Sequence, residues 1–218
     1  MANKRAQAPD RWESIHQLAK MESVEAIEAL LVRFTYHADP SITDAEEKDA
    51  AFDAVVAGGE RSVGPVRAYL VKSETISWPL RMLDRLLPPD EVVAILIETL
   101  AKMDTEYERD PERKLQLLST LEERHDVRSI AVVKRFLEDV NETARFNAVG
   151  AIFAQDNAAE AQADLVAALA KEDSVRVRTR VLEGFAARGW SVDAAKDAIL
   201  KSLPPGFMLD PKGVPKKR

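Results

Sequence analysis

Two stretches of this sequence repeat each other at a spacing of 33 residues. When NETARFNAVGAIFA (141–154) is aligned with SVRVRTRVLEGFAA (174–187), Arg145 lies over Arg178 and Ile152 lies over Phe185. The preceding segments, VVKRFLED and LVAALAKE, agree at the same offset. A fixed period of about 30 to 45 residues is typical of helical repeats, each of which can bury its apolar face only against its neighbours. We therefore expect short units stacked side by side.

The same register extends toward the N-terminus through Lys114, Pro79 and Lys48. The steps between successive anchors, from Lys48 to Arg178, are 31, 35, 31 and 33 residues. Each of the three earlier anchors is followed three and four residues later by an apolar pair: Leu117-Leu118, Met82-Leu83 and Ala51-Phe52. The two earliest repeats are degenerate, and the later ones define the period.

Helix patterns recur along the chain, and convincing strand alternation is missing. In VRSIAVVKRFLE (127–138) the apolar residues Ile130, Val133 and Leu137 share one helical face. Thr43 with Glu46 reads as a capping box, and the glycines at 58, 59 and 189 suit helix ends. The pattern predicts an all-α chain of roughly twelve helices, each of about 10 to 16 residues, with short connections.

The segment LEDVNETARFNAVGAI resembles the first helix of a HEAT repeat, with an acidic residue in the turn followed by an arginine and small apolar positions. KEDSVRVRTRVLEGFA resembles it in the same way. The resemblance implies a right-handed, armadillo-like α-solenoid of about six antiparallel helix pairs over residues 10–203. Residues 1–9 and 204–218 are then expected to be a flexible N-terminal tail and a C-terminal tail. The motif is specific for fold and nearly silent on function.

Charge and composition narrow the function classes. Residues 1–109 hold 13 basic and 20 acidic residues, whereas residues 110–218 hold 18 and 17. A net charge of −6 makes general nucleic-acid binding a poor expectation, because binding to phosphates depends on Lys and Arg. The start, MANKRAQAPDRWE, lacks the apolar core of a signal peptide, and no apolar run approaches the roughly 18 residues of a membrane span. We expect a cytoplasmic protein without a membrane contact.

No catalytic set, metal site or cofactor site is predicted. The chain has no cysteine, which excludes disulfides, a thiolate nucleophile and sulfur-based zinc sites. The three histidines, His16, His37 and His125, lie in separate segments and none belongs to a HExxH motif. No phosphate-binding glycine loop and no GxSxG motif is present. The expectation is therefore a protein that is not an enzyme.

In HEAT-like arrays the second helix of each pair lines the concave side, so the resemblance implies that a partner binds there. Stepping about 100° per residue from the inward anchors Ile27, Val63, Val93 and Ile130 gives the outward rows of these helices. The alternative interpretation is that the charged residues of these rows only keep the helix surface solvated. The predicted partner-binding residues are Tyr36, Arg61, Lys72, Glu91, Glu98, Lys102, Arg128 and Arg135.

Arg145 and Arg178 stand at equivalent positions beside the turn acids Asp139 and Asp173. They predict either an inter-repeat ladder of acid–arginine pairs, which we favour, or an arginine row that binds an anion. The tail LPPGFMLDPKGVPKKR (203–218) predicts either a cap over the last repeat or a short binding peptide.

Three functions follow from these observations. We favour a non-catalytic scaffold or adaptor that binds a protein partner. One alternative is a diverged HEAT-like DNA glycosylase or other nucleic-acid-binding protein. However, Trp12, Trp78 and Trp190 do not match the catalytic constellation of that class and are expected to pack structurally. The other is a lyase-like assembly chaperone of a chromophore protein. The sequence leaves the oligomeric state open.

Overall fold

The computed structural model describes residues 6–217 and is built almost entirely of helices. Twelve α-helices and one two-stranded sheet occur within these residues, which confirms the prediction of an all-α chain. The chain divides into two compact units, residues 1–95 and 96–218, and the boundary falls inside helix α6 (Pro89–Ala101). Each unit is described by itself.

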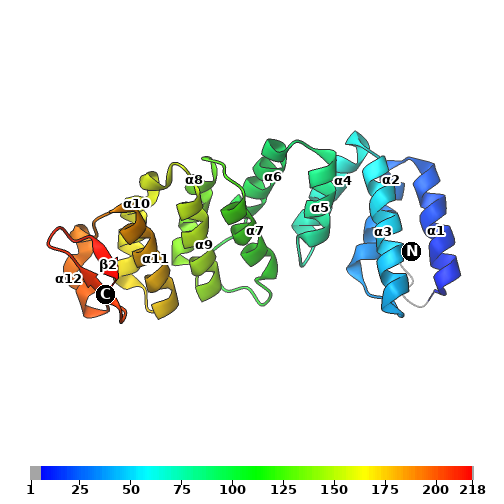
Figure 1. Cartoon of the computed structure of the whole chain (residues 1–218). Coiled ribbons are helices and arrows are strands. Elements are labelled where there is room, and N and C mark those ends of the chain that lie inside the picture. Colours follow the sequence, from blue (N-terminus) through cyan, green and yellow to red (C-terminus); the bar gives the residue numbers. More distant parts are fainter. Residues whose placement is uncertain (1–5, 218) are drawn as a thin grey trace. The chain divides into compact units, whose positions relative to one another are not determined.

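In the first unit, α1, α3 and α5 pack in sequence against one another, and α2 packs on α1, α3 and α4 (Figure 1). Helices that alternate along the chain are therefore neighbours in space. The elements are α1 (Ala8–Met21), α2 (Val24–Leu31), the 3-10 helix η1 (Val32–Thr35), α3 (Ser41–Ala57), α4 (Glu60–Lys72) and α5 (Ser77–Leu86).

Local sequence sets these helix ends. The Ser23 hydroxyl accepts a hydrogen bond from the Ala26 N–H and so caps α2. Gly59, with φ of 57°, makes the tight turn between α3 and α4. The expected capping box at Thr43 is wrong, because α3 begins earlier, at Ser41, with Pro40 as its N-cap residue.

As in the first unit, alternating helices of the second unit are neighbours in space. Helices α7, α9 and α11 pack side by side (Figure 1). The elements η2, α10 and α12 form a second series of neighbours. The elements are α7 (Glu112–Glu123), α8 (Ser129–Val133), η2 (Lys134–Glu138), α9 (Glu142–Ala154), η3 (Ala158–Ala161), α10 (Gln162–Lys171), α11 (Val175–Arg188), η4 (Asp193–Ala195), α12 (Lys196–Lys201), β1 (Phe207–Leu209) and β2 (Pro215–Lys217).

Equivalent caps mark equivalent helices in this unit. The Asn141 side chain accepts hydrogen bonds from two backbone N–H groups at the start of α9, and the Ser174 hydroxyl accepts one at the start of α11. Gly189, with φ of 65°, ends α11 as expected. The fully buried core includes Leu117, Leu118, Ala148, Ile152, Leu182 and Phe185.

The repeat register matches the order of the helices. Its five anchors fall in α3, α5, α7, α9 and α11, which are the alternate helices of the chain. Within each unit these alternate helices are the ones that pack next to each other. The spacing of about 33 residues is therefore the length of one helix pair with its turns.

The expected C-terminal tail is a β-hairpin instead. Strands β1 and β2 pair antiparallel, and β2 packs on α11. Phe207 and Val214 are buried, and the Asp210 carboxylate accepts the backbone N–H groups of Lys212 and Val214 across the turn. Of the two predicted roles for this segment, this packing favours the cap.

The expected N-terminal boundary also shifts. Helix α1 begins at Ala8, two residues before the predicted start, and Pro9 is accommodated because the first turn of a helix needs no backbone donor there. Residues 1–5 of the expected tail lie outside the described residues.

Candidate functional site

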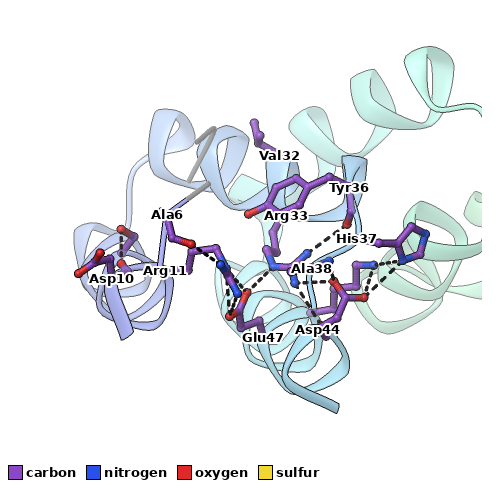
Figure 2. Close-up of polar contacts among 12 residues, drawn as sticks. Ala6, Asp10, Arg11, Val32, Arg33, Tyr36, His37, Ala38, Asp44 and Glu47 are labelled. Carbon is purple, nitrogen blue, oxygen red and sulfur yellow. Dashed lines mark hydrogen bonds and ion pairs between the residues drawn. The ribbon is translucent and has the colours of Figure 1, made fainter. Parts of the chain in front are cut away.

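A cluster of charged side chains lies inside the first unit, where α1, η1 and α3 meet (Figure 2). We call Arg11, Arg33, Asp44, Glu47 and Lys48 the buried ion cluster. Glu47 is fully buried between two guanidinium groups: its Oε1 lies 2.9 Å from Nη2 of Arg11 and its Oε2 lies 2.8 Å from Nε of Arg33. The carboxylate thereby joins α1 and η1 to α3.

Asp44 is the second carboxylate of the cluster. Its Oδ1 accepts hydrogen bonds from Arg33 Nη2 at 2.6 Å and from the Ala38 N–H at 2.8 Å, and its Oδ2 accepts one from Lys48 Nζ at 2.7 Å. Burial alone would raise the pKa of Asp44. The hydrogen bonds from Lys48, Arg33 and Ala38 outweigh burial and hold the pKa far below its ordinary value.

The cluster has the chemistry of a structural clamp. Both carboxylates are surrounded by cationic donors and shielded from solvent, so they tie α1, η1 and α3 together. The exposed His37 reaches it only at the edge, 3.5 Å from Asp44. Sequence reasoning missed this cluster, although Glu47, Ala51 and Val55 recur at four-residue spacing and so place Glu47 on the buried stripe of α3.

Two grooves flank the ridge formed by α2 and η1 in the same unit. The α1–α2 groove has a volume of about 730 Å³ and the α2–α4 groove about 310 Å³, and Val32 lines both. The α1–α2 groove is lined by Asp10, Glu13, Ser14, Gln17, Leu18, Ala29 and Val32. The α2–α4 groove is lined by Glu28, Leu31, Val32, Thr35, Pro65, Ala68, Tyr69 and Lys72.

The acids beside these grooves differ from those of the buried ion cluster. Asp10, Glu13 and Glu28 are exposed, and none forms an ion pair with any described residue. Lys72 lies at the far wall of the α2–α4 groove. Burial raises the pKa of Tyr69, against a smaller opposing effect of its hydrogen bond with Ser73. The grooves therefore combine apolar floors with charge that no neighbouring side chain neutralises.

The predicted partner-binding residues are divided between the two units. In the first unit, Tyr36 is a correction: it is buried, with 6% of its surface exposed, and its ring lies 4.6 Å from the Arg33 guanidinium. Arg61 is exposed and donates to the Glu22 carbonyl at 2.8 Å. Lys72 and Glu91 are exposed, and Lys72 alone of the eight predicted residues lines one of the two grooves.

In the second unit, Glu98, Lys102, Arg128 and Arg135 are exposed. Arg128 pairs with Asp126 in its own turn, with Nε 2.8 Å from Oδ1. Arg135 donates from Nη1 and Nη2 to the carbonyls of Ala101 and Met103, both at 3.1 Å, and so caps the C-terminal end of α6.

The turns of the second unit are tied by a repeating set of ion pairs, which we call the turn ladder. Lys114 Nζ lies 2.8 Å from Oδ2 of Asp139, and both side chains are fully buried. Arg145 donates to the Asp139 carbonyl and pairs in bidentate fashion with Glu172, at 2.8 and 2.9 Å. Each rung thus links a helix of one repeat to the turn of the next.

The acid that pairs with Arg145 differs from the one predicted from the sequence, Asp139. The carboxylate that pairs with Arg145 is Glu172, because Asp139 is taken by Lys114. Arg178 lies 3.9 Å from the exposed Asp173, a looser contact. Burial raises the pKa of Glu172, but the hydrogen bond from Arg145 and the Ser174 N–H lower it overall. Because these cations face carboxylates, the geometry favours a ladder over an anion site.

The tryptophans pack against other side chains. The Trp78 ring lies 4.8 Å from that of Phe34, and the Trp190 ring lies 5.5 Å from that of Phe185. Trp12 stacks on His16 with ring centroids 5.6 Å apart. All three tryptophans are half-buried, and each packs against a neighbouring aromatic ring.

Within residues 6–217, no three His, Asp or Glu side chains are placed to hold a metal ion. None of the helices in that range has both the length and the apolar character needed to cross a bilayer. In comparisons with known proteins, no family model, curated protein or solved structure matches the chain.

Proposed function

We propose that this protein is a non-catalytic scaffold or adaptor of the HEAT-repeat type, which binds a protein partner in the cytoplasm. The period of about 33 residues and the side-by-side packing of alternate helices within each unit support a HEAT-like α-solenoid. In such an array the second helices of successive pairs form the surface that meets a partner.

The observation that carries the proposal is the α2–α4 groove. It lies between the second helices of two consecutive pairs, and Leu31, Val32, Pro65 and Ala68 give it an apolar surface. Apolar grooves between helices commonly take a helix or an extended segment of another protein. Lys72, predicted from the sequence as an outward residue of this row, supplies a charge at its edge.

Site-specific photo-crosslinking tests this proposal. We would place a benzophenone amino acid at Ala68, which lines the groove, and in a control variant at Asp49, which is exposed on α3. Irradiation of the native host should give a discrete protein adduct from position 68 and none of the same mass from position 49. No adduct, or the same adducts from both positions, would contradict the proposal.

The proposal also expects no general affinity for nucleic acid. The acids beside the two grooves repel phosphate, and the tryptophans are engaged in packing. We expect the protein to pass unretained over immobilised duplex DNA at low ionic strength. Retention that falls steeply with added salt would instead support the nucleic-acid-binding alternative.

A further inference from the structure

We propose that the α1–α2 groove binds a cationic amphipathic helix of a partner protein. The proposal rests on the protein-binding function above but uses a different groove and names the chemistry of the partner. Its two supports are the open side of the first helix pair and the charge around that opening.

Among the described elements, the neighbours of the first helix pair lie on one side of it. Helix α1 packs on α2 and α3, and α2 packs on α3 and α4, so one side of the pair is covered by the next pair. None of the described elements covers the groove between α1 and α2. A helix laid in this groove would pack on the pair much as a further repeat would, with a ridge of its side chains between those of α1 and α2.

The floor of the groove suits apolar side chains. Leu18 of α1 and Ala29 and Val32 of the α2–η1 ridge line it. The small side chain of Ala29 leaves room for a larger residue from the incoming helix. Anchors spaced three and four residues apart on one face of that helix would match such a groove.

The rim of the groove is acidic. Asp10, Glu13 and Gln17 follow one stripe of α1 and line this groove, whereas Glu28 of α2 lines the neighbouring α2–α4 groove. No ion pair with a described residue neutralises Asp10, Glu13 or Glu28.

Charge complementarity therefore selects a cationic partner. The first unit as a whole has 16 acidic and 11 basic residues, so its longer-range field has the same sign as the rim. Among the described residues that line the two grooves, Lys72 is the one cation, and it borders the α2–α4 groove. Lysines or arginines on either side of an apolar stripe would be steered to the rim and held in one orientation.

Fluorescence anisotropy with a designed probe tests the inference on the full chain. The probe is a labelled 18-residue helix with one leucine–alanine face flanked by lysines, and the control is a scrambled peptide of the same composition. We expect the scrambled peptide to bind at least about tenfold more weakly, because it keeps the charge but lacks the apolar face.

Three groove variants and one matched control assign the site. Asp10→Lys with Glu13→Lys should weaken probe binding about tenfold, and Ala29→Trp and Ser14→Trp should each weaken it about fivefold by filling the groove without adding charge. The control, Glu46→Lys with Asp49→Lys, reverses two exposed acids on α3 and should change affinity less than about twofold. Circular dichroism and thermal melting confirm that each variant folds.

Several results would overturn the inference. The first is that the scrambled peptide binds as tightly as the probe. The second is that neither tryptophan variant weakens probe binding. The third is that the α3 control loses as much affinity as the Asp10→Lys, Glu13→Lys variant. Sedimentation of the chain alone provides a further outcome: a dimer that Ala29→Trp dissociates would identify a second copy as the occupant. Crosslinking from Ala68 is independent of the α1–α2 groove, so it would stand if only this inference failed.

Discussion

The two units of this protein hold their buried charges in different ways. In the first unit, Glu47 and Asp44 are shared among cations from three elements, and the cluster lies inside the helix packing (Figure 2). In the second unit, the charges form single rungs at the turns, as between Lys114 and Asp139. The first unit thus has a closed cluster, and the second has a series of ion pairs at successive turns.

This difference supports the proposed position of the docking surface. The acids of the turn ladder, Asp139 and Glu172, are paired with cations of neighbouring helices. In the first unit the pairing is concentrated in the interior, and the acids of the outer face of α1 and α2 remain unpaired among the described residues. The first unit therefore presents apolar grooves with uncompensated charge, which is the surface expected of a docking site.

The largest effect should follow from Glu47→Gln. The substitution leaves two buried guanidinium groups facing an amide, and loss of one partner from a buried ion pair costs about 3 to 5 kcal/mol. Urea unfolding monitored by circular dichroism would measure the change. Glu46→Gln, at the exposed neighbouring position, should change stability by less than about 0.5 kcal/mol. Equal effects would show that the cluster is no more than surface charge.

A slightly smaller loss should follow from Lys114→Met in the turn ladder. Asp139 would then be buried without its ion-pair partner, at a cost of about 3 kcal/mol to the free energy of unfolding. Adding Asp139→Asn removes the unpaired buried charge, so the double variant should recover part of the lost free energy of unfolding. If the double variant is as unstable as the sum of the single ones, the two residues are not coupled.

Arg145→Met should have a still smaller effect. Its side chain is about one-fifth exposed, and Glu172 keeps its hydrogen bond from the Ser174 N–H, so we expect a loss of about 1.5 kcal/mol. The same unfolding experiment measures it. A loss as large as that of Lys114→Met would show that a fully buried rung and a partly exposed rung contribute equally.

The pH dependence of stability should separate the two units further. The pKa values of Asp44 and Glu172 are lowered on folding, so the unfolded chain binds more protons and stability falls as pH drops. The loss should begin as pH approaches the unfolded values of about 4 and continue below them. Melting temperatures between pH 6 and pH 3 should fall less steeply in Asp44→Asn, and to a smaller degree in Glu172→Gln. Slopes unchanged from the parent chain would contradict this assignment.

Much of the helix order could be predicted from the sequence, because period and amphipathicity are local properties. The anchors from Lys48 to Arg178 fall in alternate helices, and Gly189 ends α11. The start of α3 differs from the prediction. Pro40 is its N-cap residue, whereas Thr43 and Glu46 predicted a capping box, because a cap needs an extended backbone as well as the right residue types.

The candidate site was harder to predict, because it depends on contacts between distant segments. Tyr36 follows a 3-10 turn that changes the helical phase, so stepping about 100° per residue placed a buried ring outside. Arg135 donates a hydrogen bond to the carbonyl of Ala101 at the end of α6, and no local pattern reveals this contact between distant segments. The hairpin after Pro205 depends on the packing of β2 on α11, which the local sequence does not reveal.

Hydrogen–deuterium exchange of the full chain, with and without the cationic amphipathic helix, tests the central claim that the first unit carries the docking surface. We expect the probe to slow amide exchange in α1 and α2 and to leave α7, α9 and α11 unchanged. Slowed exchange in the second unit, or no change anywhere at saturating probe, would contradict that claim.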